Sequence, residues 1–60
     1  MTLKLEFETD NAAFDGYRAD EVSRILREIA ERVEAGIEAD DIRDINGNKI
    51  GQYAMIEEGA

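Results

Sequence analysis

The chain has 60 residues, with fifteen acidic and seven basic side chains, so its formal net charge is −8 at pH 7. Such an acidic protein repels nucleic acid and anionic membranes, and we expect direct binding to neither. The chain has no cysteine, histidine or proline, which excludes disulfides, an ordinary Cys/His zinc site and catalysis by a thiolate or an imidazole. This length predicts a single small domain over residues 1–60 with a thin core, and a homodimer is the expected additional source of stability.

The first predicted element is a strand over residues 2–9. Leu3, Leu5 and Phe7 alternate strictly with Lys4, Glu6 and Glu8, a pattern that is typical of a half-buried strand. Residues 10–18 are rich in Asp, Asn and Gly and predict a loop. Within that loop, Phe14 and Tyr17 have two open interpretations: they cover the edge of the core, or they anchor a binding surface.

The clearest pattern in the chain predicts an amphipathic helix over residues 19–36. The apolar residues recur at steps of three and four and are Val22, Ile25, Leu26, Ile29, Ala30 and Val33. The opposite face is charged and carries Asp20, Arg24, Arg27, Glu28, Glu31 and Glu34. Gly36 can adopt the left-handed conformation that ends a helix. The acidic connection predicted over residues 37–41 places negative charge at the negative end of the helix dipole, which is mildly unfavourable.

Residues 41–56 predict a β-hairpin, for which two registers are possible. A two-residue turn at Asn46-Gly47 would place Ile42 opposite Gly51. A type I turn that starts at Asp44, with Gly47 in a G1 bulge, would place Ile42 opposite Ile50.

We favour the second register because it brings two isoleucines together on the core face. Ala54 and Ile56 then share that face. Tyr53 and Met55 lie on the opposite face, where they form the natural contact of a dimer.

Together these elements predict an α+β fold of β-α-β-β order, with one amphipathic helix packed on a three-stranded sheet that ends in a β-hairpin. The first strand could lie parallel beside the second or antiparallel beside the third. We prefer the second arrangement, order 1-3-2, because the helical crossover then spans an intervening strand.

The sequence offers little chemistry, and no catalytic, cofactor-binding or metal-binding residue is predicted. Ser23 is the only serine, and there is no glycine-rich phosphate loop. The oxygen-bearing run Asp44, Asn46 and Asn48 does not match a calcium loop, because its glycine comes too early and no Glu closes it. With neither an apolar span nor a secretory signal at the start of the sequence, a cytoplasmic location is expected.

Three segments carry a resemblance to a known group: LEFETDNAAF, RILREIAERVEAG and IRDINGNKIGQYAM. Together they resemble short acidic proteins that are encoded in phages and prophages and have no assigned chemistry. The resemblance implies a setting in the host cell, where small phage proteins often bind a host protein, including components of antiviral defence systems. It carries over no catalytic residue.

Two functional hypotheses follow. In the preferred one, a non-enzymatic inhibitor or modulator docks on a host protein with a basic surface, and one version of this contact is mimicry of nucleic acid phosphates. The predicted partner-binding residues are Glu34, Glu38, Asp40, Asp41 and Asp44, with Asp15 and Glu21 as further candidates. In the alternative, the protein is a self-associating accessory or structural module whose contact involves Tyr53 and Met55.

Overall fold

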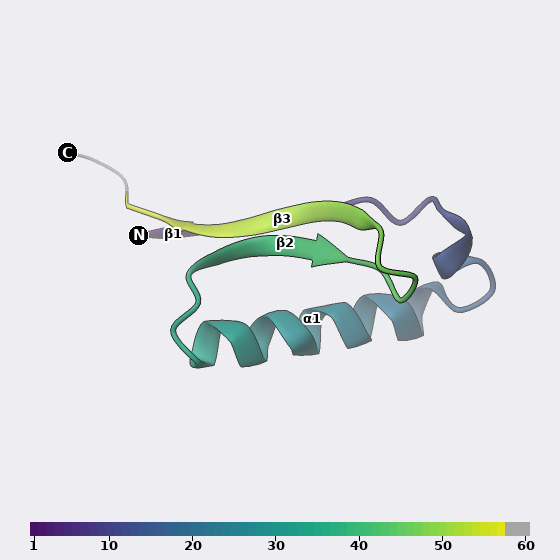
Figure 1. Ribbon diagram of the computed structural model, residues 1–60, viewed down its shortest axis with the longest axis horizontal. Helices are drawn as coiled ribbons and strands as arrows, with labels where there is room; N and C mark the ends of the chain where they lie inside the picture. Colours follow the sequence, from purple (N-terminus) through teal and green to yellow (C-terminus); the bar gives the residue numbers. More distant parts are fainter. Residues whose placement is uncertain (58–60) are drawn as a thin grey trace.

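The protein folds as one α-helix laid across one face of a three-stranded antiparallel sheet (Figure 1). The computed structural model describes residues 1–57. Its elements are strand β1 (Thr2–Phe7), the 3₁₀ turn η1 (Ala12–Phe14), helix α1 (Arg18–Glu34), strand β2 (Ala39–Arg43) and strand β3 (Lys49–Ile56). The strand order is β1-β3-β2, with both neighbours antiparallel to β3. This confirms the predicted α+β class and the preferred strand order; the added element, η1, lies in the predicted loop.

The helix and first strand form close to where the sequence predicts them, but β2 begins earlier. Residues 37–41 were expected to be a connection, whereas the strand starts at Ala39 and pairs Asp40 with Tyr53 and Asp41 with Gln52. Backbone pairing with β3 therefore outweighs the weak strand preference of aspartate. Among residues 1–57, no helix is long and apolar enough to cross a membrane.

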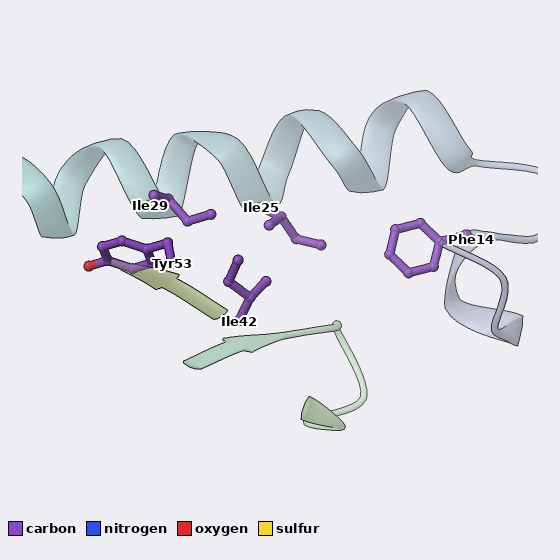
Figure 2. Packing of buried hydrophobic residues seen from close by; sticks show 5 residues of the cluster. All are labelled: Phe14, Ile25, Ile29, Ile42 and Tyr53. Atoms are coloured by element: carbon purple, nitrogen blue, oxygen red, sulfur yellow. The ribbon is translucent and has the colours of Figure 1, made fainter. Parts of the chain in front are cut away.

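The core lies between α1 and the sheet, and five side chains form its centre (Figure 2). These are Phe14, Ile25, Ile29, Ile42 and Tyr53. Phe14 comes from η1 and covers one end of the core, which is the first of the two roles considered for it. Tyr53 is only 1% exposed, so the prediction that it lies on the face away from the helix is wrong. Its hydroxyl donates a hydrogen bond of 2.8 Å to the carbonyl oxygen of Ile37.

The hairpin turn has the favoured geometry. The Asp44 carbonyl accepts a hydrogen bond of 3.0 Å from the Gly47 amide, and the Asp44 amide donates one of 2.9 Å to the Asn48 carbonyl. Gly47 has a φ of +86°, a left-handed conformation that glycine adopts without steric cost. The type I turn with a G1 bulge is therefore confirmed.

The strand register beyond that turn differs from the prediction, because a second irregularity follows. Arg43 pairs with Lys49, but Ile42 pairs with Gly51, so Ile50 is left without a partner on β2. One extra residue in β3 reverses the face of every residue after it. Tyr53 and Met55 therefore face the helix.

The residues that alternate with Tyr53 and Met55 along β3 occupy the outer face; these are Gln52, Ala54 and Ile56. Ala54 is opposite Lys4, and Gln52 is opposite Glu6. The prediction that Ala54 and Ile56 belong to the core face is thus wrong, whereas Ile50 does pack against the core at the bulge.

The apolar stripe of α1 is only partly covered. Ile25 and Ile29 are buried, and Val22 and Val33 pack at the margin of the core. Leu26 remains 45% exposed. The helix packs against η1 and against β2, the strand at the edge opposite β1, so its flank toward β1 has less to contact.

Candidate functional site

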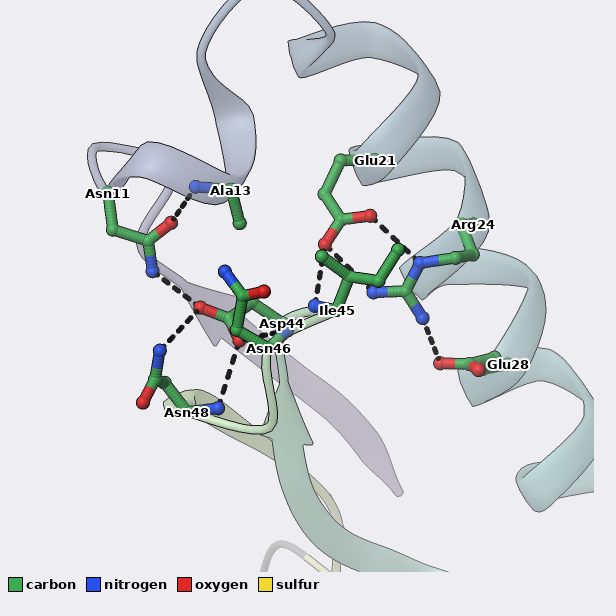
Figure 3. Close-up of polar contacts among 9 residues, drawn as sticks. All are labelled: Asn11, Ala13, Glu21, Arg24, Glu28, Asp44, Ile45, Asn46 and Asn48. Carbon is green, nitrogen blue, oxygen red and sulfur yellow. Dashed lines mark hydrogen bonds and ion pairs between the residues drawn. The ribbon is translucent and has the colours of Figure 1, made fainter.

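Two carboxylates that were candidates for partner binding are buried and belong to the fold. Glu21 is 6% exposed and Asp44 is 5% exposed. They lie where the start of α1, the hairpin turn and η1 meet (Figure 3). Within the described residues, every buried side-chain nitrogen and oxygen has a hydrogen-bond partner, so neither carboxylate has an unfilled site that calls for a ligand.

The Asp44 carboxylate organises the hairpin and fastens it to η1. Its Oδ1 accepts bonds of 2.9 Å from the amides of Asn46 and Asn48. Its Oδ2 accepts from the side-chain amide of Asn11 at 2.8 Å and from that of Asn48 at 3.3 Å. Burial by itself would raise the pKa of Asp44, but the hydrogen bonds from Asn48, Asn11 and Asn46 outweigh burial and lower it below its ordinary value.

The Glu21 carboxylate links α1 to the same turn. Arg24 donates from Nε to Oε1 and from Nη2 to Oε2, both at 2.8 Å, which gives a bidentate pair. Oε2 also accepts a bond of 3.0 Å from the Ile45 amide. The Arg24 hydrogen bonds lower the pKa of Glu21, against the opposing effect of burial, so the carboxylate stays charged. Arg24 extends the network to Glu28 at 2.8 Å.

The remaining predicted partner-binding residues divide between two surfaces. Glu34 ends α1, Glu38 lies in the connection and Asp40 is the second residue of β2, and all three are exposed. We call these three residues the acidic end. Asp40 Oδ1 accepts a hydrogen bond of 2.8 Å from the amide of its neighbour Asp41, and its Oδ2 lies 3.8 Å from Nη1 of Arg32. No ion pair within residues 1–57 involves Glu34 or Glu38.

Asp41 does not belong to the acidic end, because strand alternation turns it to the outer face of the sheet. There it contacts Lys49 Nζ at 3.3 Å and Arg43 Nη2 at 3.6 Å. Asp15, the other further candidate, is exposed in the loop beside η1. Three of the predicted acidic residues are therefore exposed within residues 34–40, at the end of α1 and the start of β2, and the others lie elsewhere.

Two of the depressions on the surface differ sharply in character. The larger, about 880 Å³, is an open polar hollow on the outer face near the hairpin, lined by residues that include Glu6, Glu8 and Lys49. The other, about 420 Å³, is almost entirely apolar and lies between β1 and α1. Its lining residues are Leu3, Leu5, Leu26, Ile29, Ala30, Val33 and Glu34. We call this second depression the β1–α1 groove.

The sequence pattern could not identify the β1–α1 groove, because it predicts the same residues as core. Leu3 is 48% exposed and Leu26 is 45% exposed. Their apolar character predicted burial, but nothing within residues 1–57 covers them fully.

No group of three or more carboxylates within residues 1–57 is arranged to hold a metal ion. In comparisons with known proteins, no protein family, curated protein or solved structure matches the chain. The arrangement offers charge at the acidic end, an apolar groove and an exposed strand edge, which are features of protein contacts.

Proposed function

We propose that the protein is a non-enzymatic binding protein that docks on a basic surface of a host protein and thereby inhibits or modulates it. The proposed contact is the acidic end, Glu34, Glu38 and Asp40. The resemblance to phage-encoded proteins suggests a cytoplasmic host partner, with a component of an antiviral defence system as the leading candidate. A surface that normally holds nucleic acid would offer suitable positive charge.

The observation that carries this proposal is negative charge that the fold does not use. The carboxylates of Glu21 and Asp44 have structural partners, whereas those of Glu34 and Glu38 form no ion pair within residues 1–57. Glu34 ends α1 and Glu38 follows it, so both place negative charge where it opposes the helix dipole. A feature that slightly disfavours the fold and has no structural partner is best explained by an external contact.

The experiment is a pull-down from bacterial host lysate, with nuclease added, using the wild type and two variants. The test variant is Glu34→Gln/Glu38→Gln/Asp40→Asn. The matched control is Glu8→Gln/Asp10→Asn/Asp15→Asn, which removes the same charge from exposed residues at the η1 end of the molecule. Mass spectrometry should identify a protein that the wild type and the control capture and that the test variant does not.

The electrostatic contact also predicts the effect of salt. Capture should decrease steeply between low and high salt, because exposed charges more than about 8 Å apart are screened at about 0.15 M ionic strength. Equal capture by the test variant and the control would contradict the proposed role of the acidic end. A partner that is lost on nuclease treatment would contradict direct protein binding.

A second candidate function, a self-associating module, is favoured by the uncovered β1–α1 groove. The contact predicted from the sequence does not support it, since Tyr53 is buried. Any self-association must use a different surface.

A further inference from the structure

The outer edge of β1 is an unpaired strand edge. On one side β1 pairs with β3 over its whole length, and no strand within residues 1–57 pairs with the other side. The Glu8 amide donates a bond of 3.0 Å to the Ile50 carbonyl, so the backbone groups of Glu8 point toward β3. Because backbone groups alternate in direction along an antiparallel strand, those of Leu3, Leu5 and Phe7 point outward. They present an ordered row of free donors and acceptors.

The side chains beside this edge are also incompletely covered. The β1–α1 groove follows the inner face of β1, and Leu3 and Leu26 are each almost half exposed along it. A free strand edge next to an apolar groove is suited to a partner that adds a strand and covers the groove at the same time.

The charges on β1 indicate which strand fits. Lys4 and Glu6 lie on the outer face, and their neighbours on β3 are the uncharged Ala54 and Gln52. Within residues 1–57, therefore, neither charge has an oppositely charged cross-strand partner. The sequence is complementary to itself about Leu5. Its two immediate neighbours, Lys4 and Glu6, have opposite charges, and the next residues on each side, Leu3 and Phe7, are both apolar.

We propose that β1 pairs antiparallel with β1 of a second copy of this chain, about a twofold axis at Leu5, so that the two sheets join. In this register each Lys4 lies opposite Glu6 of the other copy, and each Leu3 lies opposite Phe7. Leu5 lies opposite Leu5 as a hydrogen-bonded pair, which the outward direction of its backbone groups allows. Opposite charges and apolar side chains in directly facing positions both stabilise such pairing.

The other free edge of the sheet is less suited to this contact. In β2, two consecutive residues, Asp40 and Asp41, are acidic, so a twofold axis at Asp41 would place like charges opposite each other. Charged residues of this kind protect an edge strand against pairing. The β1 contact is independent of the proposed host-protein function, since it would form in the purified chain.

A charge-swap series tests both the pairing and its register. Lys4→Glu places two like-charged pairs in the dimer, and so does Glu6→Lys; we expect each to raise the dissociation constant of the dimer roughly tenfold. The double swap Lys4→Glu/Glu6→Lys restores opposite charges and should restore wild-type affinity. Arg18→Glu, an exposed change at the start of α1, is the control and should leave the dimer unchanged. Sedimentation velocity over a range of concentrations measures the association.

Amide hydrogen exchange supplies a residue-level measurement. In a monomer the amides of Leu3, Leu5 and Phe7 exchange faster than those of Lys4 and Glu6. In the proposed dimer, raising the protein concentration should slow exchange at the first three and change the other two little. Circular dichroism checks that each variant is folded.

Three results would overturn the proposal. The first is a wild type that remains monomeric up to millimolar concentration. The second is a dimer that both single swaps leave intact, and the third is a double swap that fails to restore association.

Discussion

At the scale of single residues, Gly51 is the described glycine with the least space for a side chain. It lies in the central strand, opposite Phe7 on one side and Ile42 on the other. A Cβ atom there would clash with the Glu6 carbonyl oxygen and come within 2.6 Å of the Phe7 Cα. Because both contacts are to backbone atoms, no side-chain rotation can relieve them.

We therefore expect Gly51→Ala to lower the free energy of unfolding by about 2–3 kcal/mol, as overpacking does in a rigid core. Gly47→Ala is the informative comparison: its Cβ would meet nothing within 4 Å, but its φ of +86° strains an L-residue by about 1 kcal/mol. Urea unfolding of both variants measures the difference. A smaller effect at Gly51 than at Gly47 would contradict the close approach of β1 to β3.

At the scale of elements, the carboxylates that join α1, η1 and the hairpin make stability depend on pH. The pKa of Asp44 and that of Glu21 are both lowered in the folded state. A lowered pKa means that the unfolded chain binds protons more readily than the folded one. Their stabilising contribution is therefore complete above the unfolded pKa values, about 4, and is lost as the pH falls through the lower folded values.

The urea midpoint should accordingly fall as the pH is lowered from 5 toward 2. Asp44→Asn should be less stable than the wild type at pH 7, because an amide offers one acceptor oxygen where the carboxylate uses two. The same variant should show a weaker decrease at low pH, because it cannot be protonated there. If Asp44→Asn and the wild type lost stability in parallel, Asp44 would not be a source of the acid sensitivity.

The elements also show which parts of the fold local sequence determines. The helix follows from apolar spacing, and the G1 bulge follows from Asp44 and Gly47, since each is decided within a few residues. The second bulge at Ile50 was not predictable from the hairpin alone. We attribute this bulge to the third strand: because it places Gly51 between Ile42 and Phe7, β1 can approach β3 closely. That one-residue shift moved Tyr53 into the core.

The candidate site was predictable to the same limited extent. Exposure of Glu34, Glu38 and Asp40 follows from their positions after the helix. The burial of Asp44 depends on Asn11, which lies 33 residues away in sequence, and no local pattern reports such a contact. Likewise, the exposure of Leu26 depends on which strands the helix covers, and this is decided by tertiary packing.

At the scale of the whole molecule, the net charge of −8 has opposite consequences for folding and for binding. Bringing that charge into a compact chain costs free energy through self-repulsion, and salt screens the repulsion. The ion pairs with Asp40 and Asp41 are exposed and span 3.3–3.8 Å, so little stability is lost when they are screened.

We therefore expect the melting temperature to rise by a few degrees between about 0.02 and 0.5 M NaCl, since about 1 kcal/mol shifts it by roughly 4–8 °C in a domain this small. Scanning calorimetry at fixed protein concentration measures the rise. Binding through the acidic end should weaken over the same range, because attraction between opposite charges is screened as well. A partner that is released while the fold becomes more stable would show that salt acts on the contact, whereas joint loss of fold and binding would show that salt acts through unfolding.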